Sequence, residues 1–284
     1  MKGIKDFLRG DFCVKDLGLW KGIGILILYQ IIISLGIVAI DIITKSLKIE
    51  VSNMAIIGLA LAITIIAVLG VMLIFKFMEQ SIGNRPENIK DDKSNVKNAI
   101  LMVIGYCLIR RGVLYEIGDK LSDKKIISPL IQAELNKLNP IITIVIVIIM
   151  VAIVAPVIEE ILFRGIILRG MLNRYEDRNA IIISAILFSL AHLNFLQIPN
   201  AFLLGLILAY VFYKTRALWI CMILHGIANI GALIPYEVNN PTGKVAVVIA
   251  LIIAGIIIFI KAFKNIKEYN KLEKISEQAI EYND

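Results

Sequence analysis

Two adjacent carboxylates and one guanidinium stand in an otherwise apolar stretch of the chain. Glu159 and Glu160 lie side by side, and Arg164 follows one helical turn after Glu160. Ionisable groups inside an apolar helix are costly, and they are candidates for function by default. The i,i+4 spacing lets Arg164 pair with Glu160 on one helix face, whereas Glu159 points about 100° away. The spacing predicts a structural ion pair for Glu160 and a carboxylate free to react at Glu159.

Both histidines of the chain fall in the middle of apolar runs. His192 follows Phe188 by four residues, so the two rings share a helix face. His225 precedes Asn229 by the same spacing, which places an imidazole and an amide one turn apart. One such histidine is as readily explained by packing as by function. When both histidines of the chain lie this way beside an unpaired glutamate, a joint functional site is favoured.

Together these side chains contain the groups that amide hydrolysis requires. Glu159 can act as a general base toward water, which His192 helps to hold. His225 and Asn229 can donate hydrogen bonds to a developing oxyanion, worth about 2.7–4 kcal/mol for each donor. Glu159, His192 and His225 are also a ligand set that suits Zn²⁺, which would polarise the water instead. The sequence does not choose between the metal-free and the metal-dependent mechanism.

The elements that must position these residues are membrane helices. Of the 284 residues 58% are hydrophobic, the mean hydropathy is +0.82, and the apolar residues are grouped into long runs. A bilayer core requires about 20 residues of helix and excludes open strands. The third run is the weakest, because Arg110 and Arg111 interrupt its end. We expect an all-α, polytopic membrane protein of about eight transmembrane helices, with apolar segments at 22–40, 54–75, 96–114, 141–163, 180–196, 199–213, 217–235 and 245–260.

The distribution of basic residues predicts the topology. The formal net charge is +7, and lysine and arginine flank the apolar runs at both ends of the chain. Basic flanks favour the cytoplasmic side, so we expect a multi-pass protein of the cell membrane with both termini cytoplasmic and no nucleic-acid partner. The 110–139 loop conflicts with this prediction, because it carries six basic residues on the side expected to be external.

Depth in the membrane is consistent with a single site. At a rise of roughly 1.5 Å per residue, Glu159 lies about 15 Å from Arg169, which we take as one membrane edge. His225 lies about 13 Å from Arg216, and His192 about 18 Å from Ala180 on the same scale. All three therefore fall near the middle of a core about 30 Å thick.

The three motifs, in this order on successive helices, resemble those of the CPBP family. They are Glu159-Glu160-x3-Arg164, Phe188-x3-His192 and His225-x3-Asn229. The family, also called the Abi family, comprises CAAX prenyl endopeptidases and bacteriocin-processing enzymes. The resemblance implies an eight-helix intramembrane protease that acts on prenylated CAAX tails or on peptide precursors, with or without a metal.

The resemblance covers about residues 140–235, which we expect to be the catalytic core of one integral membrane domain. Residues 1–139 would form N-terminal helices without a motif, and 236–284 the last helix and a charged tail. The sequence alone identifies neither the substrate nor the oligomeric state.

Other chemistries match the sequence less well. It contains neither His-Glu-x-x-His nor Gly-x-Ser-x-Gly, and Ser184 and Ser189 are better explained by packing or by bonding within their own helix. Cys221 precedes His225 by four residues, but a Cys–His dyad would leave the other site residues without a role. A transporter would distribute its charges along a path across the membrane. The main alternative is a non-catalytic bacteriocin-immunity or partner-binding protein, whose polar cluster holds helices together.

Overall fold

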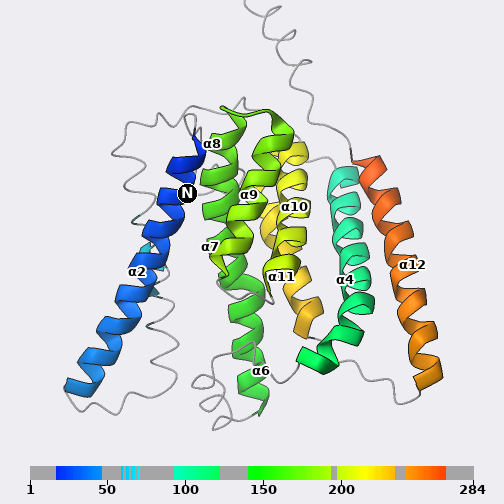
Figure 1. Cartoon of the computed structure of the whole chain (residues 1–284), viewed down its shortest axis with the longest axis horizontal. Helices are drawn as coiled ribbons and strands as arrows, with labels where there is room; N and C mark the ends of the chain where they lie inside the picture. The colour runs from blue at the N-terminus through cyan, green and yellow to red at the C-terminus, as the bar shows by residue number, and fades with distance from the viewer. Residues whose placement is uncertain are drawn as a thin grey trace, which may run out of the picture.

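The computed structural model describes residues 17–46, 93–121, 140–192, 197–233 and 241–266, with separate positions between 59 and 70, and these residues form helices and no strand. Figure 1 shows a central group of helices with α2 on one side and the α4–α12 pair on the other. The elements are α2 (Leu19–Ser46), α4 (Lys93–Leu121), α6 (Pro140–Ile149), η1 (Met150–Val154), α7 (Ala155–Glu160), η2 (Ile161–Leu168), α8 (Arg169–Leu172), α9 (Asp177–Ala191), α10 (Ile198–Thr215), α11 (Leu218–Leu233) and α12 (Pro241–Asn265).

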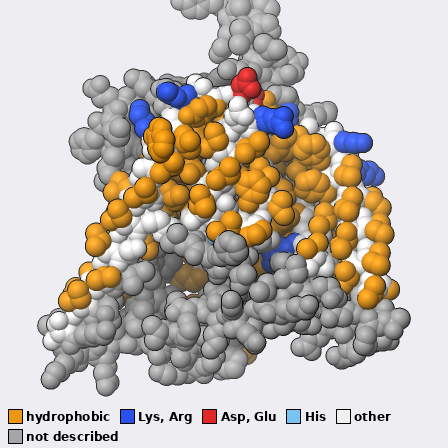
Figure 2. Space-filling model, viewed as in Figure 1, with side chains coloured by type: hydrophobic (Ala, Val, Ile, Leu, Met, Phe, Trp, Pro, Cys, Tyr) orange, Lys and Arg blue, Asp and Glu red, His pale blue; other side chains and the backbone are white. Residues whose placement is uncertain are grey.

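The described helices are those of a membrane protein, which confirms the expected all-α polytopic fold. By length and composition, four of them can cross a bilayer: Leu19–Gly36, Ile144–Leu172, Ile198–Thr215 and Val245–Asn265. Aliphatic side chains cover the outer helix faces in Figure 2, as a lipid environment requires. The expected segment 54–75 lies largely outside the described residues, as do residues 122–139 of the basic loop.

Close packing of glycines joins α4 to α12. A Cβ atom on Gly105 would lie 2.7 Å from the carbonyl oxygen of Gly255, so the two backbones touch. Small residues permit this approach between membrane helices, where dispersion replaces the hydrophobic effect. Beyond this contact α4 continues through the two arginines expected to weaken it. Arg110 and Arg111 donate to the carbonyl oxygens of Ala228 and Gly231 near the C-terminal end of α11, at 3.4 and 3.1 Å.

The centre of the molecule is one long helical segment, residues 140–172, surrounded by α9, α10 and α11. Two stretches of it are π-helical, η1 before α7 and η2 after it. Short π-helical stretches in helices occur frequently at functional sites, because the wider turn changes the direction of side chains and carbonyl groups. Here both stretches flank the six-residue segment that carries the paired glutamates.

Candidate active site

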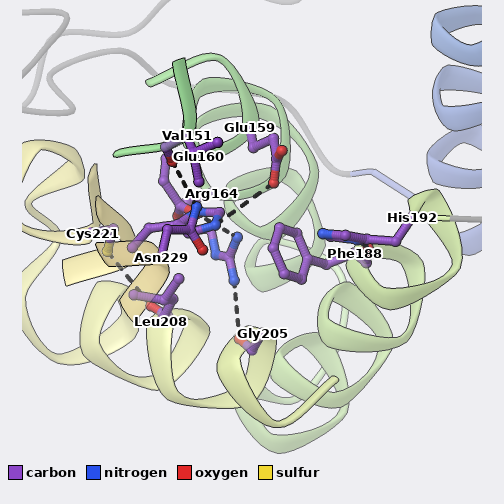
Figure 3. Close-up of polar contacts among 11 residues, drawn as sticks. Val151, Glu159, Glu160, Arg164, Phe188, His192, Gly205, Leu208, Cys221 and Asn229 are labelled. Carbon is purple, nitrogen blue, oxygen red and sulfur yellow. Dashed lines mark hydrogen bonds and ion pairs between the residues drawn. The ribbon is translucent and has the colours of Figure 1, made fainter. Parts of the chain in front are cut away.

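The predicted ion pair between Glu160 and Arg164 forms the centre of a buried polar network. Glu160 Oε1 accepts from Arg164 Nη1 at 2.8 Å, and both side chains are fully buried. The same oxygen lies 2.8 Å from His225 Nδ1, and Arg164 Nη2 donates to the carbonyl of Gly205 at 3.1 Å. One carboxylate and one guanidinium thereby connect the central helix to α10 and α11 (Figure 3).

Phe188 contacts both histidines. Its ring lies 5.0 Å from that of His192 and 5.6 Å from that of His225, with both pairs edge to face. The Arg164 guanidinium lies 4.5 Å from the Phe188 ring centroid, a cation–π contact in a fully buried setting. Phe163 also packs edge to face against the Phe188 ring, at 5.1 Å. Phe188 thus holds the three predicted motifs in contact with one another.

Glu159 differs from Glu160 in the way that their spacing predicts. Its side chain is 26% exposed, against 0% for Glu160, and it makes no ion pair with Arg164. Its Oε2 atom is buried, has no hydrogen-bond partner, and lies 3.8 Å from His225 Nε2. Two polar atoms at this separation can both contact one water molecule placed to one side of them. The Glu159 side chain is therefore accessible, and its Oε2 atom can still accept a hydrogen bond.

The contact between His225 and Glu160 determines the tautomer of this histidine. A carboxylate only accepts, so the Nδ1 atom of His225 carries the proton and donates it to Glu160. In the neutral ring Nε2 then presents a lone pair toward Glu159. It donates a hydrogen bond only when the ring is protonated. The role of His225 as an oxyanion donor, predicted from sequence, stays a prediction and requires the imidazolium form.

His192 lies at the C-terminal end of α9, further from Glu159. Its Nδ1 atom is 2.9 Å from the Phe188 carbonyl, which can only accept, so Nδ1 is the protonated nitrogen. The Nε2 atom is consequently an acceptor, suited to holding a water molecule. Among the described residues no hydrogen bond or ion pair joins His192 to Glu159, and Figure 3 shows His192 on the far side of Phe188 from Arg164.

Asn229 is directed by a proline that lies outside the three motifs. Pro156 lacks the N–H that would bond to Val151 O across the π-helical turn, and the Ala155 N–H bonds to Met150 O instead. The Val151 carbonyl, which lacks this backbone donor, accepts a hydrogen bond from Asn229 Nδ2 at 2.8 Å. Neighbouring side chains commonly satisfy carbonyls freed by proline in membrane helices. The signal in the sequence was a proline within an apolar run, three residues before Glu159.

Gly226 allows α11 to lie directly against η1 beside the site. A Cβ atom there would collide with the carbonyl oxygen of Ala152, a backbone atom that cannot move aside alone. We expect Gly226→Ala to push His225 away from Glu160. This variant should have a lower melting temperature, and any cleavage rate should fall at least tenfold. Gly24→Ala is the matched control, because no atom lies within 4 Å of its Cβ position. Equal melting temperatures for the two variants would contradict this packing.

The three candidate metal ligands do not converge. Among the residues that the structure describes, no group of three His, Cys, Asp or Glu side chains is arranged to hold a metal ion. Glu159 approaches His225, while His192 is separated from that pair by the Phe188 ring. Both histidines have the Nδ1–H orientation that metal ligands also show, but their positions do not match a shared ion. The zinc hypothesis for Glu159, His192 and His225 therefore does not fit this geometry.

The alternative nucleophiles have other contacts. The Cys221 thiol donates to the carbonyl of Leu208 at 3.5 Å, and His225 Nδ1 is occupied by Glu160, so no Cys–His pair forms. Ser189 Oγ donates to the carbonyl of Ile186 in its own helix at 2.8 Å, as expected from sequence. Ser184 Oγ is buried without a partner and has no base beside it among the described residues.

Comparison with known protein families is consistent with the geometry. Residues 141–231 match the family model described as type II CAAX prenyl endopeptidase Rce1-like. Over this segment, the chain is similar to the Rce1-like family. The Rce1-like segment contains all seven predicted site residues, and the resemblance to CAAX proteases expected from the motifs is confirmed. No curated protein and no solved structure matches the chain.

Proposed function

We propose that this protein is an intramembrane endopeptidase that hydrolyses a peptide bond with water activated by Glu159. The observation that supports this proposal most strongly is the difference between the two adjacent glutamates. Glu160 is fully buried and bonded to Arg164 and His225 through Oε1, whereas Glu159 is 26% exposed, makes no ion pair with Arg164 and has its Oε2 atom 3.8 Å from His225 Nε2. A carboxylate that served only to hold helices together would be expected to have a cation partner as Glu160 has, because an unpaired charge in a membrane helix is costly.

The reaction follows from the protonation pattern. Glu159 removes a proton from a water molecule as the water oxygen bonds to the scissile carbonyl carbon, and the carbonyl oxygen becomes an oxyanion. His192 presents a lone pair on Nε2, but Phe188 separates it from Glu159 and His225, so the proposed step does not assign it a contact with this water molecule. Glu159 then transfers its proton to the amide nitrogen as the C–N bond breaks. The products are a new carboxylate and a free amine.

The roles of the remaining residues are to hold this arrangement. Glu160 and Arg164 orient His225, and Phe188 excludes water from the space between the two histidines. His225 in its protonated form, together with the second N–H of Asn229, is proposed to stabilise the oxyanion. Excluding water strengthens each of these interactions, because the effective dielectric constant is low.

The proposed substrates are membrane-associated. The Rce1-like match supports a prenylated C-terminal CAAX tail, and the position of the site within apolar helices supports a substrate that reaches it from the bilayer. A leader-bearing peptide precursor is the second substrate class that the site chemistry accommodates. The described polar network would act on the peptide bond and contains no group specific for a prenyl chain.

The test is cleavage by purified protein in detergent of three fluorescence-quenched peptides: a farnesylated CAAX peptide, the same peptide without lipid, and a leader-bearing precursor. We expect cleavage of the farnesylated peptide at least tenfold faster than of its unmodified form, with no change on adding a chelator. Faster cleavage of the leader peptide would reassign the substrate class. Cleavage of none by folded protein would favour the non-catalytic immunity or partner-binding alternative.

A further inference from the structure

The N-terminal helix α2, which carries no recognised motif, packs against the site. A Cβ atom on Gly22 would lie 2.8 Å from Met171 Cε and 3.2 Å from Leu187 Cδ1, so α2 fits closely between the central helix and α9. Two turns further on, Gln30 Nε2 donates to the carbonyl of Ala191 at 2.7 Å. Ala191 is adjacent to His192, and the ribbon of α2 passes on the same side in Figure 3. Helix α2 is therefore one wall of the site.

Helical geometry places Tyr29 level with Glu159. Tyr29 is seven residues after Gly22, which is two turns along the same face and about 10 Å deeper. The Gly22 position also contacts Ile167, and Glu159 lies eight residues before Ile167, about 12 Å back along the central helix. Because α2 and this helix run in opposite directions (Figure 1), the two displacements point the same way. Tyr29 and Glu159 thus reach the same depth from facing helices.

The environment of Tyr29 agrees with this placement. Its side chain is only 7% exposed, and its hydroxyl makes no hydrogen bond to any described residue. Tyr29 O–H is therefore a hydrogen-bond donor without a partner among the described residues, at the depth of the reactive carboxylate.

We propose that Tyr29 is a further catalytic residue, whose hydroxyl donates a hydrogen bond to the oxyanion formed beside Glu159. This inference rests on the proposed function. The motif residues already use donors elsewhere. His225 donates a hydrogen bond from Nδ1 to Glu160, and Asn229 donates one from Nδ2 to the Val151 carbonyl. A neutral phenol supplies a donor that requires no protonated imidazole. Its energetic benefit arises only when negative charge develops, as an oxyanion donor requires.

The test compares Tyr29→Phe with the wild-type chain, using the farnesylated CAAX peptide. Tyr29→Phe removes one oxygen atom and keeps the ring in place. We expect kcat to fall about 100-fold while KM changes less than threefold, since the lost contact is made only in the transition state. The melting temperature should change little, because the lost hydroxyl has no hydrogen-bond partner among the described residues. An unchanged kcat in Tyr29→Phe, with wild-type cleavage intact, would overturn the inference and leave the proposed function standing.

Tyr106→Phe is the matched control. Tyr106 lies on α4, and its hydroxyl already has an acceptor, Asn200 Oδ1 at 2.6 Å. This variant should show the opposite signature, a lower melting temperature with an unchanged kcat for the folded fraction. A fall in kcat in both variants would contradict a specific role for Tyr29.

A second measurement does not depend on cleavage. Melting temperatures of Tyr29→Phe, Glu159→Gln and the double variant form a thermodynamic cycle. Groups that share one small polar space couple, whereas groups more than about 7–10 Å apart add. Non-additive shifts support the juxtaposition of Tyr29 and Glu159, and additive shifts overturn it. A wild-type chain that cleaves none of the three peptides removes both the proposed function and the catalytic role of Tyr29.

Discussion

Glu159→Gln should lower kcat by about 10²–10⁴-fold, the range that a positioned general base contributes. The amide keeps the size of the side chain but cannot accept the proton of the attacking water. Folding should be unaffected, because Glu159 makes no ion pair with Arg164 and its Oε2 atom has no partner to lose. Steady-state kinetics on purified protein, with melting temperature measured in the same detergent, give both values.

Glu176→Gln is the control for this substitution. Glu176 is exposed and precedes α9 at the end of the helix opposite to His192, so the same chemical change is made outside the site. We expect a cleavage rate equal to wild type in this variant. Comparable rates for Glu159→Gln and wild type would remove Glu159 from the mechanism.

Arg164→Met should produce the largest loss of stability of any single change in the site. The substitution leaves Glu160 as a buried carboxylate without its cation, which costs about 3–5 kcal/mol when one partner of a buried pair is removed. It also removes the hydrogen bond to Gly205 and the stacking on Phe188. We expect a large fall in melting temperature and in the yield of monodisperse protein, measured by size exclusion in detergent.

The double variant Glu160→Gln with Arg164→Met separates lost charge pairing from lost packing. Removing the stranded charge should recover a substantial part of the stability lost in Arg164→Met, because a neutral amide is much cheaper to bury than a carboxylate. Recovery should not restore catalysis, since His225 loses the carboxylate that orients it. A double variant no more stable than Arg164→Met would contradict the assignment of Glu160 as a buried charge.

Short-range spacing in the sequence predicted the local geometry of the site. The Glu160–Arg164 pair and the exposure of Glu159 follow from helix periodicity alone, because residues four apart share a face. The apolar runs likewise predicted most of the described helices. Among them is α4, which extends beyond its expected apolar segment although it contains two arginines. Local periodicity is decided by neighbours in the chain, so one sequence is sufficient to predict it.

Contacts between helices could not be predicted in the same way. The sequence grouped His192 with Glu159, whereas the histidine nearest to Glu159 in the structure is His225. Tautomers were also beyond prediction, since they depend on acceptors contributed by other helices or by carbonyls. Helix α2 had no motif to indicate that Gln30 and Tyr29 face the site. The hydrogen bond from Asn229 to the Val151 carbonyl could not be predicted either, because the sequence does not show which donor lies opposite a carbonyl freed by proline.

The central claim is that Glu159 activates water for peptide hydrolysis, and mass spectrometry of the products tests it most directly. Purified wild-type protein in lipid vesicles is incubated with the farnesylated CAAX peptide beside Glu159→Gln at equal folded concentration. We expect release of the three C-terminal residues by the wild type and none above background by the variant. Equal release by both proteins would contradict it, because cleavage would then proceed without this carboxylate.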